Sequence, residues 1–230
     1  MVRKDRELSL ADFVLAPSSL TQRTVAEAGF SVSRVKVIPY AVYADEVSPE
    51  ITPRQPLVVC AGIISMRKGV HRLLRVWKRL KAHQTHRLLL IGDMHLAPGF
   101  LKDYRGLYEH VPRMPRPSLL EQFDQARLLV FNSLGDGFGM VVTEAMARGT
   151  AVLVSRNAGS SDRISDGIEG RLVDYGDDDQ LATVLDQMLS RPDELREMGV
   201  RGRQKVCCWT WAQFGDEFAA WIKGTVLAKP

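Results

Sequence analysis

From residue 56 onward the chain alternates short, continuous apolar runs with stretches that show the apolar spacing of a helix. The apolar runs cover residues 57–61, 88–91, 128–131, 151–154 and 172–173. Runs without polar alternation are typical of strands buried on both faces, as in parallel sheets. Helical patterns cover residues 70–82, 118–126, 139–148, 178–190, 193–205 and 210–224. This order predicts an α/β fold, a Rossmann-like parallel sheet with helices on both faces.

Residues 1–50 follow a different pattern. A strand pattern at residues 12–18 leads into a helix that can be capped by Ser18 or Ser19 and that stops at Gly29. A second short strand pattern covers residues 35–40 and ends at a proline. One helix between two strands cannot bury its own apolar face. We therefore expect a fragment of another layer, joined to the sheet by a linker near residues 41–56.

Composition is ordinary for a soluble globular protein, with 45% apolar and 25% charged residues. No apolar run approaches the roughly 20 residues that a membrane-spanning helix needs. The cysteines, Cys60, Cys207 and Cys208, show no zinc-site spacing, and the adjacent pair disfavours a structural disulfide. We expect a cytoplasmic chain with reduced thiols and no structural metal, and we interpret its five histidines as surface residues.

Positive charge is concentrated in one stretch. Between Glu50 and Asp93 there are nine Lys and Arg residues and no acidic residue. Such a stretch suits a phosphate-bearing ligand, a nucleic acid or an anionic membrane surface, and it also fits a solvated helix face. A nucleic acid is disfavoured because the one aromatic residue there, Trp77, falls on the apolar helix face. Peripheral membrane contact through residues 70–82 stays open.

The glycine-rich turn in residues 132–154 carries the most chemistry. Gly135, Gly137 and Gly139 lie between a predicted strand and a predicted helix, where backbone N–H groups can approach a ligand closely. The helix N-terminus then offers unpaired donors to a phosphate or sugar oxygen. Asp136 and Glu144 can accept hydrogen bonds from sugar or ribose hydroxyls. A tight turn followed by a surface Glu is the alternative interpretation of the same residues.

Residues 136–152 (DGFGMVVTEAMARGTAV) resemble the acidic motif of the family 4 retaining glycosyltransferases. These enzymes have two facing Rossmann-like domains, the GT-B fold. The family has Glu where this chain has Asp136, and Pro where it has Ala151. Residues 62–69 (GIISMRKG) are similar to the family's phosphate-binding loop, with Ile63 in place of an arginine. Residues 159–170 (GSSDRISDGIEG) resemble a third family motif, with Asp162 in place of Glu.

The resemblance implies sugar transfer from a nucleoside-diphosphate sugar with retention at the anomeric carbon and without a metal or other cofactor. It gives catalytic roles to Lys68, at the diphosphate, and to Asp136, at the donor sugar. It places Glu144 on the ribose hydroxyls and Met114 beside the nucleobase. The remaining donor-binding residues that it implies are Gly62, Arg67, Gly137, Phe138, Gly139 and Met140. For Arg67, replacement of the missing arginine and a simple surface position both stay open.

The same resemblance divides the chain into three parts. Residues 1–50 are expected to be a remnant of the N-terminal acceptor domain with the linker, and residues 51–208 the nucleotide-sugar-binding domain. Residues 209–230 are expected to form a C-terminal helix that returns toward the acceptor domain. A partner chain, or self-association, is expected to complete the acceptor face. The nucleobase, the donor sugar and the acceptor stay open.

Two other functions are weighed against transfer. A non-catalytic nucleotide-sugar-binding subunit or pseudoenzyme would share the fold and the donor residues. A dinucleotide-dependent oxidoreductase would need G-x-G-x-x-G after the first strand, which residues 62–69 do not match.

Overall fold

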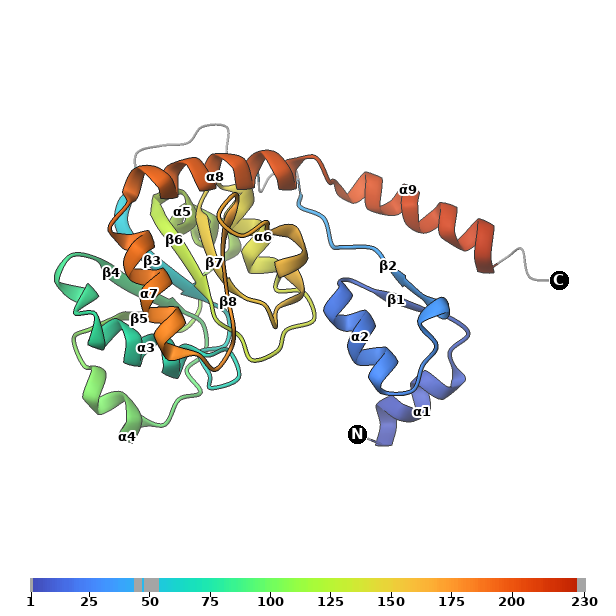
Figure 1. Cartoon of the computed structure of the whole chain (residues 1–230), viewed down its shortest axis with the longest axis horizontal. Coiled ribbons are helices and arrows are strands. Elements are labelled where there is room, and N and C mark those ends of the chain that lie inside the picture. The colour runs from blue at the N-terminus through green and yellow to red at the C-terminus, as the bar shows by residue number, and fades with distance from the viewer. Residues whose placement is uncertain (1, 44–46, 48–53, 227–230) are drawn as a thin grey trace.

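The computed structural model describes residues 2–43, 47 and 54–226, and its body is a six-stranded parallel sheet (Figure 1). The strand order is β5-β4-β3-β6-β7-β8. The strands are β3 (Gln55–Ala61), β4 (Arg87–Ile91), β5 (Glu109–Val111), β6 (Ala126–Phe131), β7 (Ala151–Ser155) and β8 (Gly170–Val173). The predicted fold class is confirmed, and every predicted apolar run is a strand. The edge strand β5 was not predicted, because it has three residues and two of them are Glu and His.

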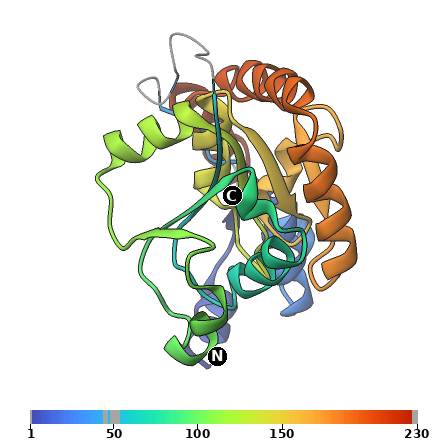
Figure 2. The same ribbon diagram turned by 90° about the vertical axis from the view of Figure 1, so that its left-hand side faces the viewer.

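Helices between the strands and after the last strand cover both faces of the sheet (Figure 2). They are α3 (Val70–Arg79), α4 (Pro98–Leu101), α5 (Arg116–Gln125), α6 (Met140–Ala147), α7 (Asp178–Leu189) and α8 (Pro192–Cys207). All the helices predicted between the strands are present, with ends that differ by a few residues. The helix expected over residues 70–82 ends early, because Lys81 takes a positive φ of 53° and the backbone leaves the α conformation.

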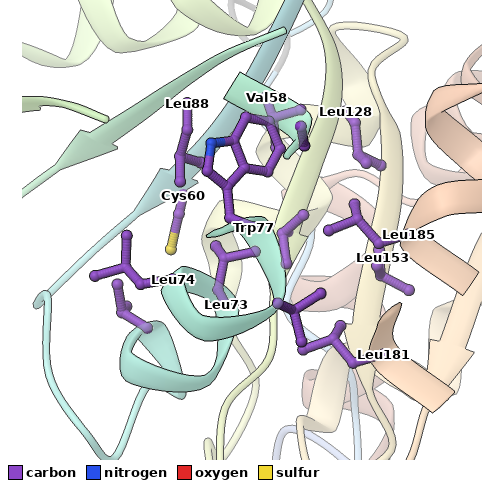
Figure 3. Packing of buried hydrophobic residues seen from close by; sticks show 14 of the residues in the cluster. Val58, Cys60, Leu73, Leu74, Trp77, Leu88, Leu128, Leu153, Leu181 and Leu185 are labelled. Carbon is purple, nitrogen blue, oxygen red and sulfur yellow. The ribbon is translucent and has the colours of Figure 1, made fainter. Parts of the chain in front are cut away.

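The core has two halves because successive strand residues point to opposite faces of the sheet. Val58 and Cys60 of β3 pack with α3 and α7 on one face, whereas Leu57 and Val59 pack with α5 and α6 on the other. Trp77 of α3 is fully buried among Val58, Leu88 and Leu128 (Figure 3). Its indole Nε1 donates to a backbone carbonyl at 2.9 Å, so this large ring brings no unpaired donor into the core.

The N-terminal segment forms its own small layer. It contains α1 (Val2–Leu10), β1 (Val14–Ala16), α2 (Ser19–Glu27) and β2 (Val35–Val37), and β1 and β2 pair in parallel apart from the main sheet (Figure 1). The Ser18 side chain caps α2, as predicted. Helix α1 was not predicted. Most of the predicted linker at residues 41–56 lies outside the described residues, and from Gln55 the chain already forms β3.

Helix α9 (Trp211–Trp221) returns to this N-terminal layer. Just before it, the indole Nε1 of Trp209 donates to the carbonyl of Pro39 at 2.8 Å. Farther along, the rings of Trp221 and Phe13 meet edge to face with their centroids 6.0 Å apart. No residue of α9 is buried, so its aromatic side is only half covered.

The basic stretch is largely paired within the chain. On α3, Arg72 and Arg79 form ion pairs with Asp178 and Asp179 at the start of α7, at 2.8 and 2.7 Å. Arg54 donates to three backbone carbonyls, at the end of α5, the start of β6 and the end of α6, and to the hydroxyl of Thr150. Lys68, Arg75 and Arg87 also pair with carboxylates. Internal contacts therefore account for six of the nine cations, without an external polyanion.

Two side chains test the predictions for cysteine and histidine. Cys60 is a core residue, as the apolar run 57–61 predicted, and burial raises the pKa of its thiol to about 12. His71 is 8% exposed, so its assignment to the surface was wrong. It lies in the first turn of α3 beside Val70, where the apolar face of the helix turns toward the sheet. Burial, and then Arg75 and Arg72, lower the pKa of the imidazole, while Asp178 opposes them.

Candidate active site

The candidate site lies where the strand order changes direction. The chain passes from β3 outward to β4 and β5, then returns to place β6 against the other side of β3. In sheets of this topology, ligands bind beyond the carboxyl ends of the strands at this point. A cleft of about 500 Å³ opens there. Eight predicted site residues line it: Gly62, Arg67, Lys68, Asp136, Gly137, Phe138, Gly139 and Met140.

Two glycines start the helices that border the cleft. Gly69, at the start of α3, has φ 71°, and a Cβ there would lie 1.7 Å from the carbonyl oxygen of Asn132. Gly139, at the start of α6, has φ 86°, and a Cβ there would press on the ring of Phe131 at 2.8 Å. The backbone therefore requires glycine at both positions. The close approach brings both helix N-termini to the ends of the central strands.

The N-terminus of α6 offers hydrogen-bond donors. Within the described part of the chain, the amides of Gly139, Met140 and Val141 donate to no backbone or side-chain acceptor. All three residues line the cleft. Unpaired amides at a helix start, together with the helix dipole, favour an anionic group such as phosphate.

Lys68 and Asp136 form an ion pair in the wall of the cleft. Their side chains are only 13% and 18% exposed. The ammonium group of Lys68 also lies 4.9 Å from the ring centroid of Phe131, within range of a cation–π interaction. The second carboxylate oxygen of Asp136 accepts a hydrogen bond from the amide of Phe138 at 3.2 Å. The two predicted catalytic side chains are thus brought together, with opposite charges in contact.

Glu144 and Met114 do not line this cleft. Glu144 lies one turn farther along α6 than Met140, with Oε1 3.4 Å from a guanidinium nitrogen of Arg116 and with 14% of its side chain exposed. Burial raises the pKa of the Glu144 carboxyl, and the charge of Arg116 opposes the shift. Met114 is partly buried against the core that α5 and α6 share. Arg116, at the start of α5, was not predicted because its proline-rich surroundings resemble a loop.

Arg67 and Ile63 lie at the mouth of the cleft. Arg67 is exposed, and its Nη1 donates to the carbonyl of Gly135 at 2.9 Å, so it braces the glycine-rich turn. Ile63, which stands in place of the family's arginine, is 44% exposed. The cleft therefore has an apolar side chain at one position where the resemblance led us to expect a cation.

The N-terminal segment also contributes to the cleft, which the sequence did not reveal. Pro17 and Tyr40 line it. The ring of Tyr40 lies edge to face on Phe138, with the centroids 5.2 Å apart. The position of Tyr40 at the end of the second predicted strand, residues 35–40, was the one available signal, since ligands gather at strand ends.

The described residues contain no group of three or more His, Cys, Asp or Glu side chains placed to hold a metal ion. Within the same residues, no helix has both the length and the apolar character that crossing a membrane requires.

Comparisons with known proteins agree on one family. Residues 44–205 match the family described as glycosyl transferases group 1. A GDP-mannose-dependent alpha-(1-6)-phosphatidylinositol monomannoside mannosyltransferase from Mycolicibacterium smegmatis is 27% identical over 93% of this chain and 63% of its own length. The chain spans less than two thirds of the length of this relative and of each of the two solved structures described next.

Two solved structures share the fold. Sucrose-phosphate synthase from Thermosynechococcus elongatus superposes with a TM-score of 0.85 at 22% identity, over 99% of this chain and 62% of its own. HepE from Anabaena, in complex with UDP and glucose, gives a TM-score of 0.77 at 17% identity, over 93% of this chain and 63% of its own.

Proposed function

This chain belongs to the group 1 glycosyltransferases, and from that premise we propose that it is the donor-binding portion of a retaining enzyme. The enzyme would transfer a sugar from a nucleoside-diphosphate sugar to an acceptor, with no metal at the diphosphate. The observation that carries the proposal is the cleft itself, where Lys68 and the unpaired amides at the start of α6 meet.

In the proposed reaction, the bond between the anomeric carbon and the phosphate oxygen breaks, and the electron pair leaves with the nucleoside diphosphate. An acceptor hydroxyl would give its proton to the departing phosphate oxygen and bond to the face of the sugar from which that phosphate leaves, which gives retention. Lys68 and the amides of Gly139 and Met140 would stabilise the charge that develops on the leaving phosphate. Preorganised donors of this kind contribute most when they line a site that excludes water.

The two carboxylates would bind the rest of the donor. Asp136 lines the cleft beside Lys68 and would face the sugar, whereas Glu144 would accept hydrogen bonds from the ribose hydroxyls. The Glu144 side chain is 14% exposed and contacts Arg116. A ribose that reaches Glu144 would therefore share its carboxylate with the Arg116 guanidinium group or displace that group. Met114 stays our candidate for the nucleobase side of the site.

Calorimetric titration with UDP, GDP and ADP tests the proposal. We expect one nucleotide to bind at micromolar to sub-millimolar concentration, and Lys68→Ala and Glu144→Ala to weaken its binding. Arg79→Ala is the matched control for Lys68→Ala, because Arg79 pairs with Asp179 at α7, away from the cleft. Equal affinity in the control and the Lys68 variant would contradict the assigned role of Lys68.

A turnover assay separates transfer from binding alone. UDP-glucose and GDP-mannose are suitable donors, because the neighbouring structures and relatives name them. Release of the nucleoside diphosphate in the presence of an acceptor would support the enzyme. Tight binding of the nucleotide sugar with no release under any acceptor would favour the non-catalytic binding subunit.

We also propose the three-part division of the chain at residues 1–50, 51–208 and 209–230. The separate β1-β2 sheet and the return of α9 to it support this division. The half-covered aromatic side of α9 supports completion of this face by further acceptor-domain structure or by self-association. Light scattering that shows a monomer at high concentration would count against self-association.

The proposed location is the cytoplasm. Contact of residues 70–82 with an anionic membrane gains little support, because Arg72 and Arg79 are already paired with carboxylates. Sedimentation of the chain with anionic vesicles at low salt would support the membrane contact.

A further inference from the structure

One carbonyl of the glycine-rich turn is held from the N-terminal segment. The hydroxyl of Ser18 donates to the carbonyl oxygen of Gly137 at 2.7 Å, and the hydroxyl of Thr21 donates to the same oxygen at 3.1 Å. Ser18 has no exposed surface, so its hydrogen bond is protected from water. Ser18 is the N-cap of α2 and Thr21 lies in its first turn, so both hydroxyls come from more than 100 residues before Gly137 in the chain.

The geometry of the peptide bond transmits this contact to Asp136. The carbonyl of Gly137 and the N–H of Phe138 belong to one planar amide, and in a trans amide they point in opposite directions. The N–H of Phe138 donates to a carboxylate oxygen of Asp136 at 3.2 Å. Holding the carbonyl therefore aims the N–H at the carboxylate. The other carboxylate oxygen meets Lys68.

The loop after β7 holds the turn from a second side. The amide of Gly159 donates to the carbonyl of Asp136 at 2.9 Å, and the amide of Ser160 donates to that of Phe138 at 2.6 Å. A Cβ at Gly159 would lie 2.2 Å from the oxygen of Gly137 and 2.4 Å from the hydroxyl oxygen of Ser18. Three successive carbonyls are thus fixed, and the middle one is fixed by α2.

The start of α2 is itself anchored to the same loop. The amide and hydroxyl of Ser19 both donate to the carboxylate of Asp162, at 2.6 and 2.7 Å. A carboxylate at a helix N-terminus also interacts favourably with the helix dipole. The hydroxyls of Ser18 and Thr21 therefore sit on a fixed support, and a displacement of α2 would move the amide that they hold.

We propose that Ser18 and Thr21 are positioning residues that orient the carboxylate of Asp136 toward the donor sugar through the Gly137–Phe138 peptide. This inference rests on the proposed function, since it assigns the sugar contact to Asp136. It adds that Ser18 and Thr21, which do not line the cleft, control sugar recognition through the peptide that they hold. The nucleotide half of the donor, held by Lys68 and the start of α6, does not depend on these hydroxyls.

A matched pair of variants tests this in the whole chain. Ser18→Gly/Thr21→Val removes both hydroxyls and keeps a residue that is tolerated at a helix start. Ser18→Gly/Thr21→Ser keeps one hydroxyl on Gly137. Thr24→Val is the control, because the hydroxyl of Thr24 donates to Leu20 within α2. Each variant is titrated with UDP-glucose, GDP-mannose and the corresponding diphosphates.

We expect the valine variant to bind the nucleotide sugar about three- to tenfold more weakly, the effect of losing a hydrogen bond of ordinary strength. The Asp136 oxygen that pairs with Lys68 is not the one that accepts from the Phe138 amide, so we expect the ion pair to stay in the valine variant. Binding of the bare diphosphate should therefore change less than twofold, and the serine variant should recover most of the loss for the nucleotide sugar. In an Asp136→Asn background the valine substitution should have no further effect. Equal losses for the sugar and the bare diphosphate, or additive losses with Asp136→Asn, would overturn the inference.

A measurement without ligand separates this inference from the proposed function. Hydrogen exchange of the Phe138 amide and the carboxyl ¹³C shift of Asp136, both by NMR, should change in the valine variant and return toward wild type in the serine variant. If no nucleotide binds to any form, the proposed function fails and this measurement still decides the positioning role. An unchanged Phe138 amide and Asp136 carboxyl would overturn it.

Discussion

Asparagine in place of Asp136 is expected to tighten the binding of a bare nucleoside diphosphate. Asp136 holds the ammonium group of Lys68 in the cleft wall, so a diphosphate must compete with this carboxylate for the cation. Exposed ion pairs contribute up to about 1 kcal/mol, and breaking a buried pair by removing one partner costs about 3–5 kcal/mol. The two side chains are 13% and 18% exposed, which places this pair between the two cases.

We therefore take about 1–2 kcal/mol as the competition that the substitution removes, between the limits for exposed and buried pairs. At about 1.4 kcal/mol for each factor of ten, this corresponds to roughly five- to thirtyfold tighter binding. The assay is calorimetric titration of the diphosphate that binds the wild type, at two salt concentrations. The nucleotide sugar should respond in the opposite direction, because it loses the proposed contact between Asp136 and the sugar.

Asp174→Asn is the matched control, since it makes the same charge change at an exposed carboxylate paired with Arg156. A gain in both variants would indicate a general effect of net charge. Unchanged or weaker diphosphate binding in Asp136→Asn would refute the reasoning, because it would show that the carboxylate does not compete for Lys68.

Three further outcomes follow from particular residues. Gly69→Ala should lower the free energy of unfolding in urea by at least about 2 kcal/mol, because its Cβ would overlap the carbonyl of Asn132 at a positive φ; an effect below about 0.5 kcal/mol would contradict the described turn. Cys60 should resist iodoacetamide at pH values around 8 until the chain unfolds, whereas the exposed Cys208 reacts at once, as mass spectrometry of the peptides would show. For His71, whose folded pKa is lowered, the unfolded chain binds more protons below the ordinary value of 6.5. Stability should therefore fall as the pH drops through that region toward the folded pKa, and His71→Gln should show a smaller fall.

The sheet and its helices were predictable because their signals are local. Runs such as residues 128–131 are apolar over four positions, and parallel strands buried on both faces require that pattern. The edge strand Glu109–Val111 gives no such signal, because an edge position tolerates polar residues. The left-handed Lys81 ended α3 earlier than its apolar spacing indicated.

The candidate site was predictable in part. Residues of the loop 62–69 and of the glycine-rich turn line one cleft, because these two segments follow the adjacent strands β3 and β6. Ser18 and Tyr40 contact the glycine-rich turn at Gly137 and Phe138. These contacts depend on how the N-terminal layer packs against the turn, and no residue spacing in the sequence predicts that packing. His71 was misassigned for a similar reason, because a polar residue near the apolar face of a helix can be covered by its neighbours.

The positions of the tryptophans allow fluorescence to report separately on two parts of the chain. Of the four, Trp77 is fully buried beside the main sheet, whereas Trp209, Trp211 and Trp221 lie where α9 meets the N-terminal layer. In a Trp77→Phe chain, tryptophan fluorescence would arise from that junction alone. Detachment of α9 could then be followed as a red shift in emission, separately from the melting of the sheet.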